Sequence, residues 1–210
     1  MVRVKICGIT TLDDALVAAA AGADALGFNF WPQSSRYLEP QRAADIITHL
    51  PPLVTPVGVF VNARPEEVER AARRAGLAAV QLHGDEGPED VKALAADGLT
   101  VLKAVRVGPR FRPQVLRRYN GARAFLLDAE VKGARGGTGK TFDWKQARAA
   151  RRYGRIILAG GLNPDNVAEA IAAAQPYGVD VCTGVENKPG VKDHERVREF
   201  IRRAKAVEAA

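Results

Sequence analysis

The chain has 210 residues, of which 47% are hydrophobic and 26% are charged, a balance typical of a folded globular protein. No apolar run approaches the roughly 18 residues needed to cross a bilayer, and no secretory leader precedes the first predicted strand, so we expect a cytoplasmic protein that does not contact a membrane. The net charge of +7 comes from basic residues spread through predicted helices rather than from a dense basic block with aromatic residues, which argues against a nucleic-acid partner.

Eight short apolar runs recur along the chain. In the first, β-branched residues alternate with Arg3 and Lys5, and the run ends at Cys7. Most later runs are nearly continuous apolar stretches, which is typical of strands buried on both faces. The predicted strands are 2–7, 23–28, 56–61, 79–82, 100–105, 124–128, 156–159 and 179–182.

A stretch with helix signals follows each run. Thr11 is a predicted N-cap, Pro40 and Pro65 stand at helix starts, and Gly22 and Gly76 stand at helix ends. The predicted helices are 11–21, 40–49, 65–76, 88–96, 112–119, one from about 143, one capped by Asn163-Pro164, and 193–207.

This alternation predicts the fold class. Eight strand-helix units in this length fit a closed, eight-stranded parallel (β/α)8 TIM barrel with short loops better than an open doubly wound sheet. No linker or low-complexity segment divides the chain, so we expect residues 1–210 to form a single domain.

In such a barrel the functional groups lie at the carboxyl ends of the strands. Arg36 lies in the long loop after the second strand. The residues expected at or just after strand ends are Cys7, Asn29, His83, Arg106, Asp128, Gly160, Gly161, Thr183 and Gly184.

Cys7 and Asp128 are the candidate base and acid. Asp128 ends an apolar strand at the rim of a dry barrel, which suits it to proton donation, although it could instead cap a loop. Cys7 would face it across the barrel mouth, where a thiolate is a competent base. Two cysteines and three histidines do not have the spacing of a zinc site, and each cysteine can simply be a buried small residue. We expect Cys182 to serve only in packing.

Glycines in two neighbouring loops predict a phosphate site. Gly160-Gly161 follows the seventh strand, and Thr183-Gly184 follows the eighth. Backbone N–H groups in such loops can approach an anion closely, and residues 184–188 could form the short extra helix often found there. The alternative is that these glycines only turn the chain.

The stretch 133–141 looks like a nucleotide-binding P-loop but has the wrong spacing. The glycine required five positions before Gly139 falls at Ala134. A glycine-rich lid beside Asp128 fits the stretch better, and a nucleotide-binding module is kept as an alternative.

Arg36 and His83 are candidate binding residues. An arginine can form two parallel hydrogen bonds to a carboxylate, although it could also be an ordinary surface residue. His83 is expected at the mouth, where a lone histidine is as often a structural hydrogen-bonding group as a functional one.

Motifs along the whole chain resemble those of the phosphoribosylanthranilate isomerase family. One motif falls in nearly every barrel unit, in order. They are Lys5-Ile6-Cys7-Gly8-Ile9-Thr10, Gly27-Phe28-Asn29-Phe30 with Ser34-Ser35-Arg36-Tyr37, Gly58-Val59-Phe60-Val61-Asn62, Gln81-Leu82-His83-Gly84-Asp85-Glu86, Leu127-Asp128 with Gly136-Gly137-Thr138-Gly139, Leu158-Ala159-Gly160-Gly161-Leu162, and Gly184-Val185-Glu186 with Pro189-Gly190-Val191-Lys192-Asp193.

The resemblance implies an Amadori rearrangement of N-(5-phosphoribosyl)anthranilate in tryptophan biosynthesis. It implies Cys7 as the general base, Asp128 as the general acid and Arg36 as the residue that holds the anthranilate carboxylate. It implies a phosphate pocket at Gly160, Gly161, Thr183 and Gly184, and neither a cofactor nor a metal. The family usually has small hydroxyl residues at both positions before Gly184, whereas this chain has Cys182 and Thr183.

Other phosphosugar barrels of the histidine and tryptophan pathways are the main alternatives. A histidine-pathway isomerase needs an aspartate on the first strand, where Cys7 stands, and an indole-glycerol-phosphate synthase needs a strand lysine, for which only Lys103 could serve. The expected assembly is a monomer or a homodimer.

Overall fold

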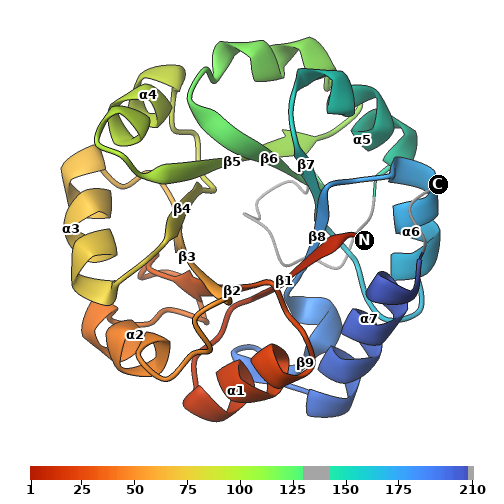
Figure 1. Cartoon of the computed structure of the whole chain (residues 1–210). Coiled ribbons are helices and arrows are strands. Elements are labelled where there is room, and N and C mark those ends of the chain that lie inside the picture. The colour runs from red at the N-terminus through yellow and green to blue at the C-terminus, as the bar shows by residue number, and fades with distance from the viewer. Residues whose placement is uncertain (130–141, 208–210) are drawn as a thin grey trace.

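The eight main strands close into a barrel. The computed structural model describes residues 1–129 and 142–207. The strands are parallel and follow one another around the barrel in chain order, with the helices outside them (Figure 1). This is the predicted single-domain (β/α)8 barrel. The glycine-rich stretch 133–141 lies outside the described residues, so its interpretation as a lid or a nucleotide loop stays a prediction.

Every predicted strand is present, with ends that differ from the prediction by at most two residues. Alternating or continuous apolar residues define each strand, as the sequence indicated. The strands are β1 (Arg3–Cys7), β2 (Ala25–Asn29), β3 (Thr55–Phe60), β4 (Ala79–Leu82), β5 (Thr100–Val107), β6 (Ala122–Ala129), β7 (Ile156–Leu158) and β8 (Gly178–Val181).

Most α-helices begin and end at or near the predicted signals, but α6 begins at Val167 with Asn166 at its N-cap, and not at the predicted Asn163-Pro164. The Thr11 side chain accepts a hydrogen bond from the backbone N–H of Asp14, and Gly76 ends α3 in the left-handed conformation with φ 69°. The helices are α1 (Leu12–Ala20), α2 (Pro40–Ile47), α3 (Pro65–Ala75), α4 (Pro88–Ala96), α5 (Trp144–Ala150), α6 (Val167–Ala174) and α7 (His194–Ala206).

Two further helix predictions are wrong. The segment 112–119 contains a 3-10 helix, η1 (Pro113–Arg118), because tight three-residue turns fit this short connection from β5 to β6. Residues 184–188 do not form one short helix. A 3-10 turn, η3 (Thr183–Val185), is followed by a hairpin of β9 (Glu186–Lys188) and β10 (Val191–Lys192). Gly190, with φ 81°, lies in the turn that reverses the chain.

Two apolar layers form the core. Larger side chains on the outer faces of the strands pack against the helices, as in the cluster that contains Phe28, Leu127 and Phe200. Inside the barrel lies a separate cluster of mostly small and branched residues, namely Val57, Ala79, Leu102, Ala104, Ala124, Leu126, Ile157 and Ala159. This inner cluster forms the floor on which polar groups nearer the strand ends rest.

Pairing of β1 with β8 closes the barrel. Lys5 is in register with Asp180, and Ile6 is in register with Val181. The next positions along these two strands are Cys7 and Cys182, so closure brings both cysteines to the same place on the rim.

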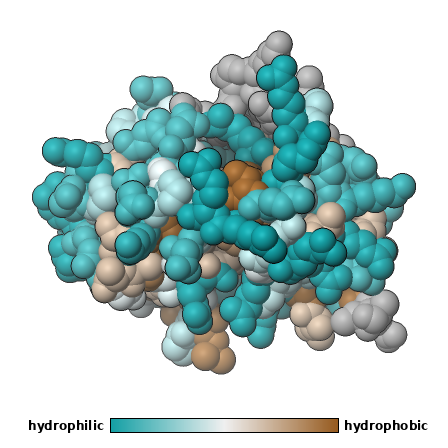
Figure 2. All heavy atoms as spheres, turned by 90° about the horizontal axis from the view of Figure 1, so that it is seen from above, coloured by the Kyte–Doolittle hydropathy of each residue, from teal (hydrophilic) through white to brown (hydrophobic). Residues whose placement is uncertain are grey.

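The outer surface is mainly hydrophilic on the face seen in Figure 2, with a small apolar area exposed near its centre. Among the described residues, no helix combines the length and apolarity that a membrane crossing requires.

A cavity made in the inner cluster should lower the stability of the protein strongly. Leu126 is fully buried, so Leu126→Ala should lower the free energy of unfolding by about 2–5 kcal/mol through lost burial and an unfilled cavity. Urea denaturation measures this change. The matched variant Leu16→Ala removes the same atoms from a side chain that is 40% exposed, and it should change stability much less.

Candidate active site

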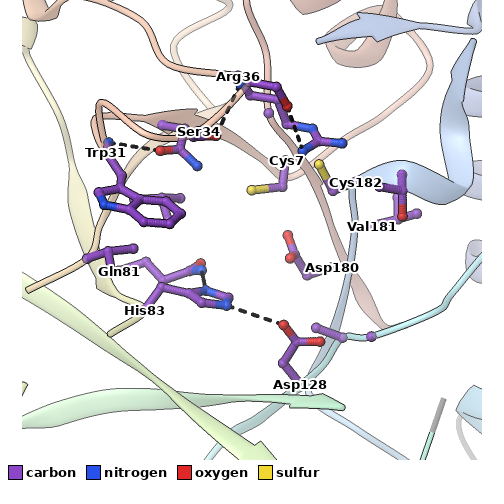
Figure 3. Close-up of a pocket in the computed structure, with 18 of the residues that line it drawn as sticks. Cys7, Trp31, Ser34, Arg36, Gln81, His83, Asp128, Asp180, Val181 and Cys182 are labelled. Carbon is purple, nitrogen blue, oxygen red and sulfur yellow. Dashed lines mark hydrogen bonds and ion pairs between the residues drawn. The ribbon is translucent and has the colours of Figure 1, made fainter. Parts of the chain in front are cut away.

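A cavity of about 340 Å³ opens at the carboxyl ends of the strands. Cys7 and Asp128 line it from opposite sides, and Asp180 lies between them in the view of Figure 3. Arg36, His83, Gly160, Gly161 and Thr183 also line it. The barrel thus brings nearly all of the predicted site residues to one cavity.

Cys7 lies among cations that the sequence prediction did not identify. A hydrogen bond from Cys182 holds the pKa of the Cys7 thiol well below its ordinary value, with further help from Lys5 and Lys192 against the opposing effect of burial. Gly27 on the neighbouring strand leaves space here, because a Cβ at that position would lie 2.7 Å from the Cys7 sulfur. These surroundings favour a thiolate.

Cys182 has polar neighbours that the expectation of a packing role did not include. Its sulfur lies 3.7 Å from Oε1 of Glu186 and 3.9 Å from Nζ of Lys192. The hydrogen bond to Cys7, together with burial, raises the pKa of Cys182 well above its ordinary value. Of the two thiols, Cys7 therefore loses its proton first.

Lys5 and Asp180 form a buried ion pair beside Cys7. Nζ of Lys5 lies 2.7 Å from Oδ1 of Asp180, and both side chains are less than a tenth exposed. Burial raises the pKa of Asp180 to about 6 although Lys5 is adjacent. Burial also opposes the charge on Lys5, but attraction to Asp180 and Cys7 outweighs it and raises the pKa of Lys5. Lys5 therefore stays a cation next to the thiol.

Asp128 is hydrogen-bonded to His83 at the opposite side of the cavity. Oδ2 of Asp128 lies 3.2 Å from Nε2 of His83, and Nδ1 of the same ring lies 2.7 Å from Nε2 of Gln81 (Figure 3). Asp128 itself is 7% exposed. The predicted acid is thus buried and is held by a histidine whose second nitrogen is also bonded.

Arg36 has a partner that the sequence analysis missed. Its Nε and Nη2 donate to the two carboxylate oxygens of Glu186 at 2.8 and 2.6 Å. Glu186 also pairs with the buried Nζ of Lys192 at 2.8 Å. Burial alone would raise the pKa of Glu186, but Arg36 and Lys192 outweigh it and lower the pKa to about 2. Arg36 is therefore fixed on one edge by Glu186, and its Nη1 also donates to Oγ of Ser35 at 3.4 Å. The remaining N–H groups of its Nη1 and Nη2 end can bind an anion.

The predicted phosphate loops lie side by side. Gly160 and Gly161, with φ 80° and 66°, turn the backbone after β7, and Thr183 follows β8. Gly184 is not among the cavity-lining residues but packs behind them, because a Cβ there would overlap the carbonyl oxygen of Leu162. Gly184 thus permits close approach of the two loops.

Some of the missed residues had a detectable signal. Lys5 and Cys7 are two positions apart on one strand, as are Asp180 and Cys182 near the end of another, so each pair shares a face. Glu186 and Lys192 had no such signal, because a hairpin and not a strand of the barrel brings them to the rim.

Lys103 does not serve the alternative role considered for it. Its side chain is 2% exposed and pairs with Glu86 at 2.6 Å, and it is not among the cavity-lining residues. Glu86 in turn accepts the backbone N–H groups of Asn62 and Gly84. This pair therefore braces the loop after β4 rather than supplying an acid to the cavity.

Comparison with known proteins identifies similar chains over the full length. A family model described as N-(5'phosphoribosyl)anthranilate (PRA) isomerase matches residues 4–203. A protein of Geobacter sulfurreducens named N-(5'-phosphoribosyl)anthranilate isomerase is 56% identical over 205 residues, covering 98% of this chain and 99% of the relative.

Solved structures agree with this similarity. The crystal structure of phosphoribosyl anthranilate isomerase from Thermotoga maritima has a TM-score of 0.91 and 46% identity, covering 98% of this chain and 99% of that one. Another, in complex with reduced 1-(o-carboxyphenylamino)-1-deoxyribulose 5-phosphate, has a TM-score of 0.87 and 44% identity with the same coverage.

The thiol pair predicts a specific pH dependence. Cys182→Ala removes the hydrogen bond to Cys7, so the pH at which Cys7 becomes reactive should rise, whereas Cys182→Ser keeps a donor and should lie nearer the wild type. The rate of iodoacetamide alkylation of Cys7, followed by mass spectrometry across pH, measures this. An unchanged midpoint in Cys182→Ala would show that Cys182 does not stabilise the thiolate.

The loop contact predicts that Gly184→Ala weakens anion binding. The added methyl group must push the loops after β7 and β8 apart, so affinity for inorganic phosphate should fall at least about tenfold, a cost of roughly 1.4 kcal/mol. Calorimetric titration measures it. Gly87→Ala is the control, because its Cβ would meet only Oδ2 of Asp90 at 3.8 Å. Equal affinity in all three proteins would refute this role for Gly184.

Proposed function

This chain belongs to the N-(5'-phosphoribosyl)anthranilate isomerase family, and we propose that Cys7 is the general base and Asp128 the general acid of its reaction. The chain is an isomerase of tryptophan biosynthesis. It converts N-(5'-phosphoribosyl)anthranilate to 1-(2-carboxyphenylamino)-1-deoxyribulose 5-phosphate by an Amadori rearrangement.

One observation carries the assignment of the acid and the base. A single cavity contains a thiol whose pKa is lowered by its neighbours and, on its far side, a buried carboxyl group. The rearrangement needs one group that donates a proton to the sugar ring and one that removes a proton from carbon. Cys7 and Asp128 supply these two functions from opposite strands.

Asp128 acts first in the proposed sequence. Its carboxyl group donates a proton to the furanose ring oxygen while the nitrogen lone pair forms a double bond to C1, so the C1–O bond breaks and the ring opens to a protonated Schiff base. Burial of Asp128 at the cavity wall keeps bulk water from competing for this proton.

Cys7 acts second. Its thiolate removes the proton from C2 of the sugar. The C–H electron pair becomes the C1–C2 double bond, and the π electrons of the C1–N double bond return to nitrogen to give an enolamine. The enolamine then tautomerises to the ketone product. Lys5 remains a buried cation beside the sulfur, and its charge favours the thiolate that this step requires.

Three further contacts are proposed to hold the substrate. The Nη1 and Nη2 end of Arg36, oriented by Glu186, binds the anthranilate carboxylate. The loops that carry Gly160, Gly161, Thr183 and Gly184 bind the phosphate at the other end. His83 lines the cavity beside Asp128 and contacts the sugar. Fixing both ends of the substrate positions C2 for reaction.

Several wider properties are part of the proposal. The whole chain, residues 1–210, works as one domain in the cytoplasm and takes a small phosphosugar as its partner rather than a nucleic acid or a membrane. It does so as a monomer or a homodimer. One relative, from Thermotoga maritima, is described as a dimer from which monomers were generated.

The acid-base assignment predicts large losses of turnover. Cys7→Ser and Asp128→Asn should each lower kcat by at least about 10³-fold, roughly 4 kcal/mol, because each removes one proton transfer. An isomerase assay with freshly generated substrate measures this.

The control for the assay is Asp45→Asn, an exposed carboxylate on α2 that is not among the cavity-lining residues and should keep wild-type turnover. Turnover near the wild-type rate in either Cys7→Ser or Asp128→Asn would overturn the assignment of that residue.

A further inference from the structure

Gln81 is a buried polar residue on the inner face of the barrel that the reaction sequence above does not use. It is 1% exposed, yet it is one of the residues that line the cavity. Gln81 and His83 are two positions apart on and just after β4, so their side chains project to the same side, as Figure 3 shows.

The Gln81 amide has one hydrogen-bond partner among the described residues. Its Nε2 lies 2.7 Å from Nδ1 of His83, and its Oε1 has no partner there. Buried polar side chains normally satisfy their hydrogen bonds, so a glutamine held by this single contact needs an explanation. The contact to His83 is the interaction that orients the amide.

A donor facing Nδ1 determines which nitrogen of the ring carries the proton. An amide N–H can bond Nδ1 only if Nδ1 is an acceptor, so the proton of the neutral imidazole lies on Nε2. Nε2 is the atom 3.2 Å from Oδ2 of Asp128. The ring then donates to Asp128 and carries no charge.

Charged groups approach His83 from several elements of the barrel. Asp128 on β6 contacts the ring, and Asp180 on β8 interacts with it electrostatically. The other charged or titratable groups on the adjacent elements are mostly paired. Lys103 is paired with Glu86, and Arg106, which is in register with Asp128, is paired with Asp85. Lys5 is paired with Asp180, and Cys7 lies on β1. Asp128 contacts the ring at Nε2, and an amide donor at Nδ1 leaves no place for a second ring proton.

We propose that Gln81 is a positioning residue that holds His83 in its neutral, Nε2-protonated form and so keeps the proton on the acid Asp128. An imidazolium at 3.2 Å would stabilise the carboxylate of Asp128 and deprive the ring-opening step of its proton. A neutral ring also donates a hydrogen bond to the carboxyl group, but without a full positive charge it stabilises the carboxylate much less. This inference rests on the proposed role of Asp128.

The variant Gln81→Glu tests this with little change in shape. A carboxylate can only accept, so Nδ1 must carry a proton, and with Asp128 at Nε2 the ring becomes an imidazolium. Gln81→Met is the matched variant that removes the amide but keeps the length of the side chain. Circular dichroism and thermal unfolding establish that each variant folds.

The first measurement is nitrogen NMR of the histidine rings. The chain has three histidines, and loss of one signal in His83→Asn assigns His83. In the wild type near pH 7 we expect the neutral form with the proton on Nε2, and in Gln81→Glu we expect an imidazolium. A wild-type ring protonated on Nδ1, or on both nitrogens, would overturn the proposal even if no variant could be purified.

The second measurement is the pH profile of kcat/KM. In Gln81→Glu the alkaline limb, which reports the protonated acid, should move to lower pH, and kcat should fall at least tenfold at neutral pH. Gln81→Met should lower kcat less and move this limb less. A Gln81→Glu profile identical to that of the wild type would also overturn the proposal.

The two proposals fail in different ways. Full turnover in Asp128→Asn would show that Asp128 is not the acid, and the proposed role of Gln81 would then fail with it. A wild-type ring protonated on Nδ1, together with an inactive Asp128→Asn, would refute only the role of Gln81.

Discussion

Pairing of the first strand with the last is the constraint on which the site depends. β1 and β8 are about 175 positions apart in the chain, as the contact between Lys5 and Asp180 illustrates. Their register brings Lys5 beside Asp180. Two positions further along each strand, it brings Cys7 beside Cys182. Without closure, a thiol on one edge strand and a carboxylate on the other would have no common environment.

This closure buries the ion pair of Lys5 and Asp180 at a position where an apolar contact would cost no desolvation of charge. A buried pair costs desolvation energy that its own attraction does not always recover, so Lys5 and Asp180 are weak evidence for added stability. They are better explained by their effect on Cys7. A lysine that stays charged in the barrel interior favours the thiolate, and Asp180 offsets the charge of that lysine when the thiol is protonated.

The two sides of the cavity show opposite electrostatic arrangements. Cations and a thiol donor surround Cys7, which favours its ionised form. Asp128 has a histidine and, behind it, an amide, with no lysine or arginine among its hydrogen-bond partners in the described residues. A base and an acid that share one small cavity need different surroundings. Without them each group would keep its ordinary pKa, and its protonation state would not suit its role.

The sequence by itself determined the order of elements, the barrel and most of the residues that line its mouth. Hydrophobic periodicity, helix caps and strand-end positions are local properties, so they located the strands to within two residues and put Cys7, Asp128 and Arg36 at the rim. Only the tertiary structure decided what surrounds each of them. Cys182 beside Cys7, Glu186 on Arg36 and Gln81 behind His83 depend on strand register and on the β9–β10 hairpin. Protonation depends on distances of a few ångströms between segments far apart in the chain, and no local pattern encodes those distances.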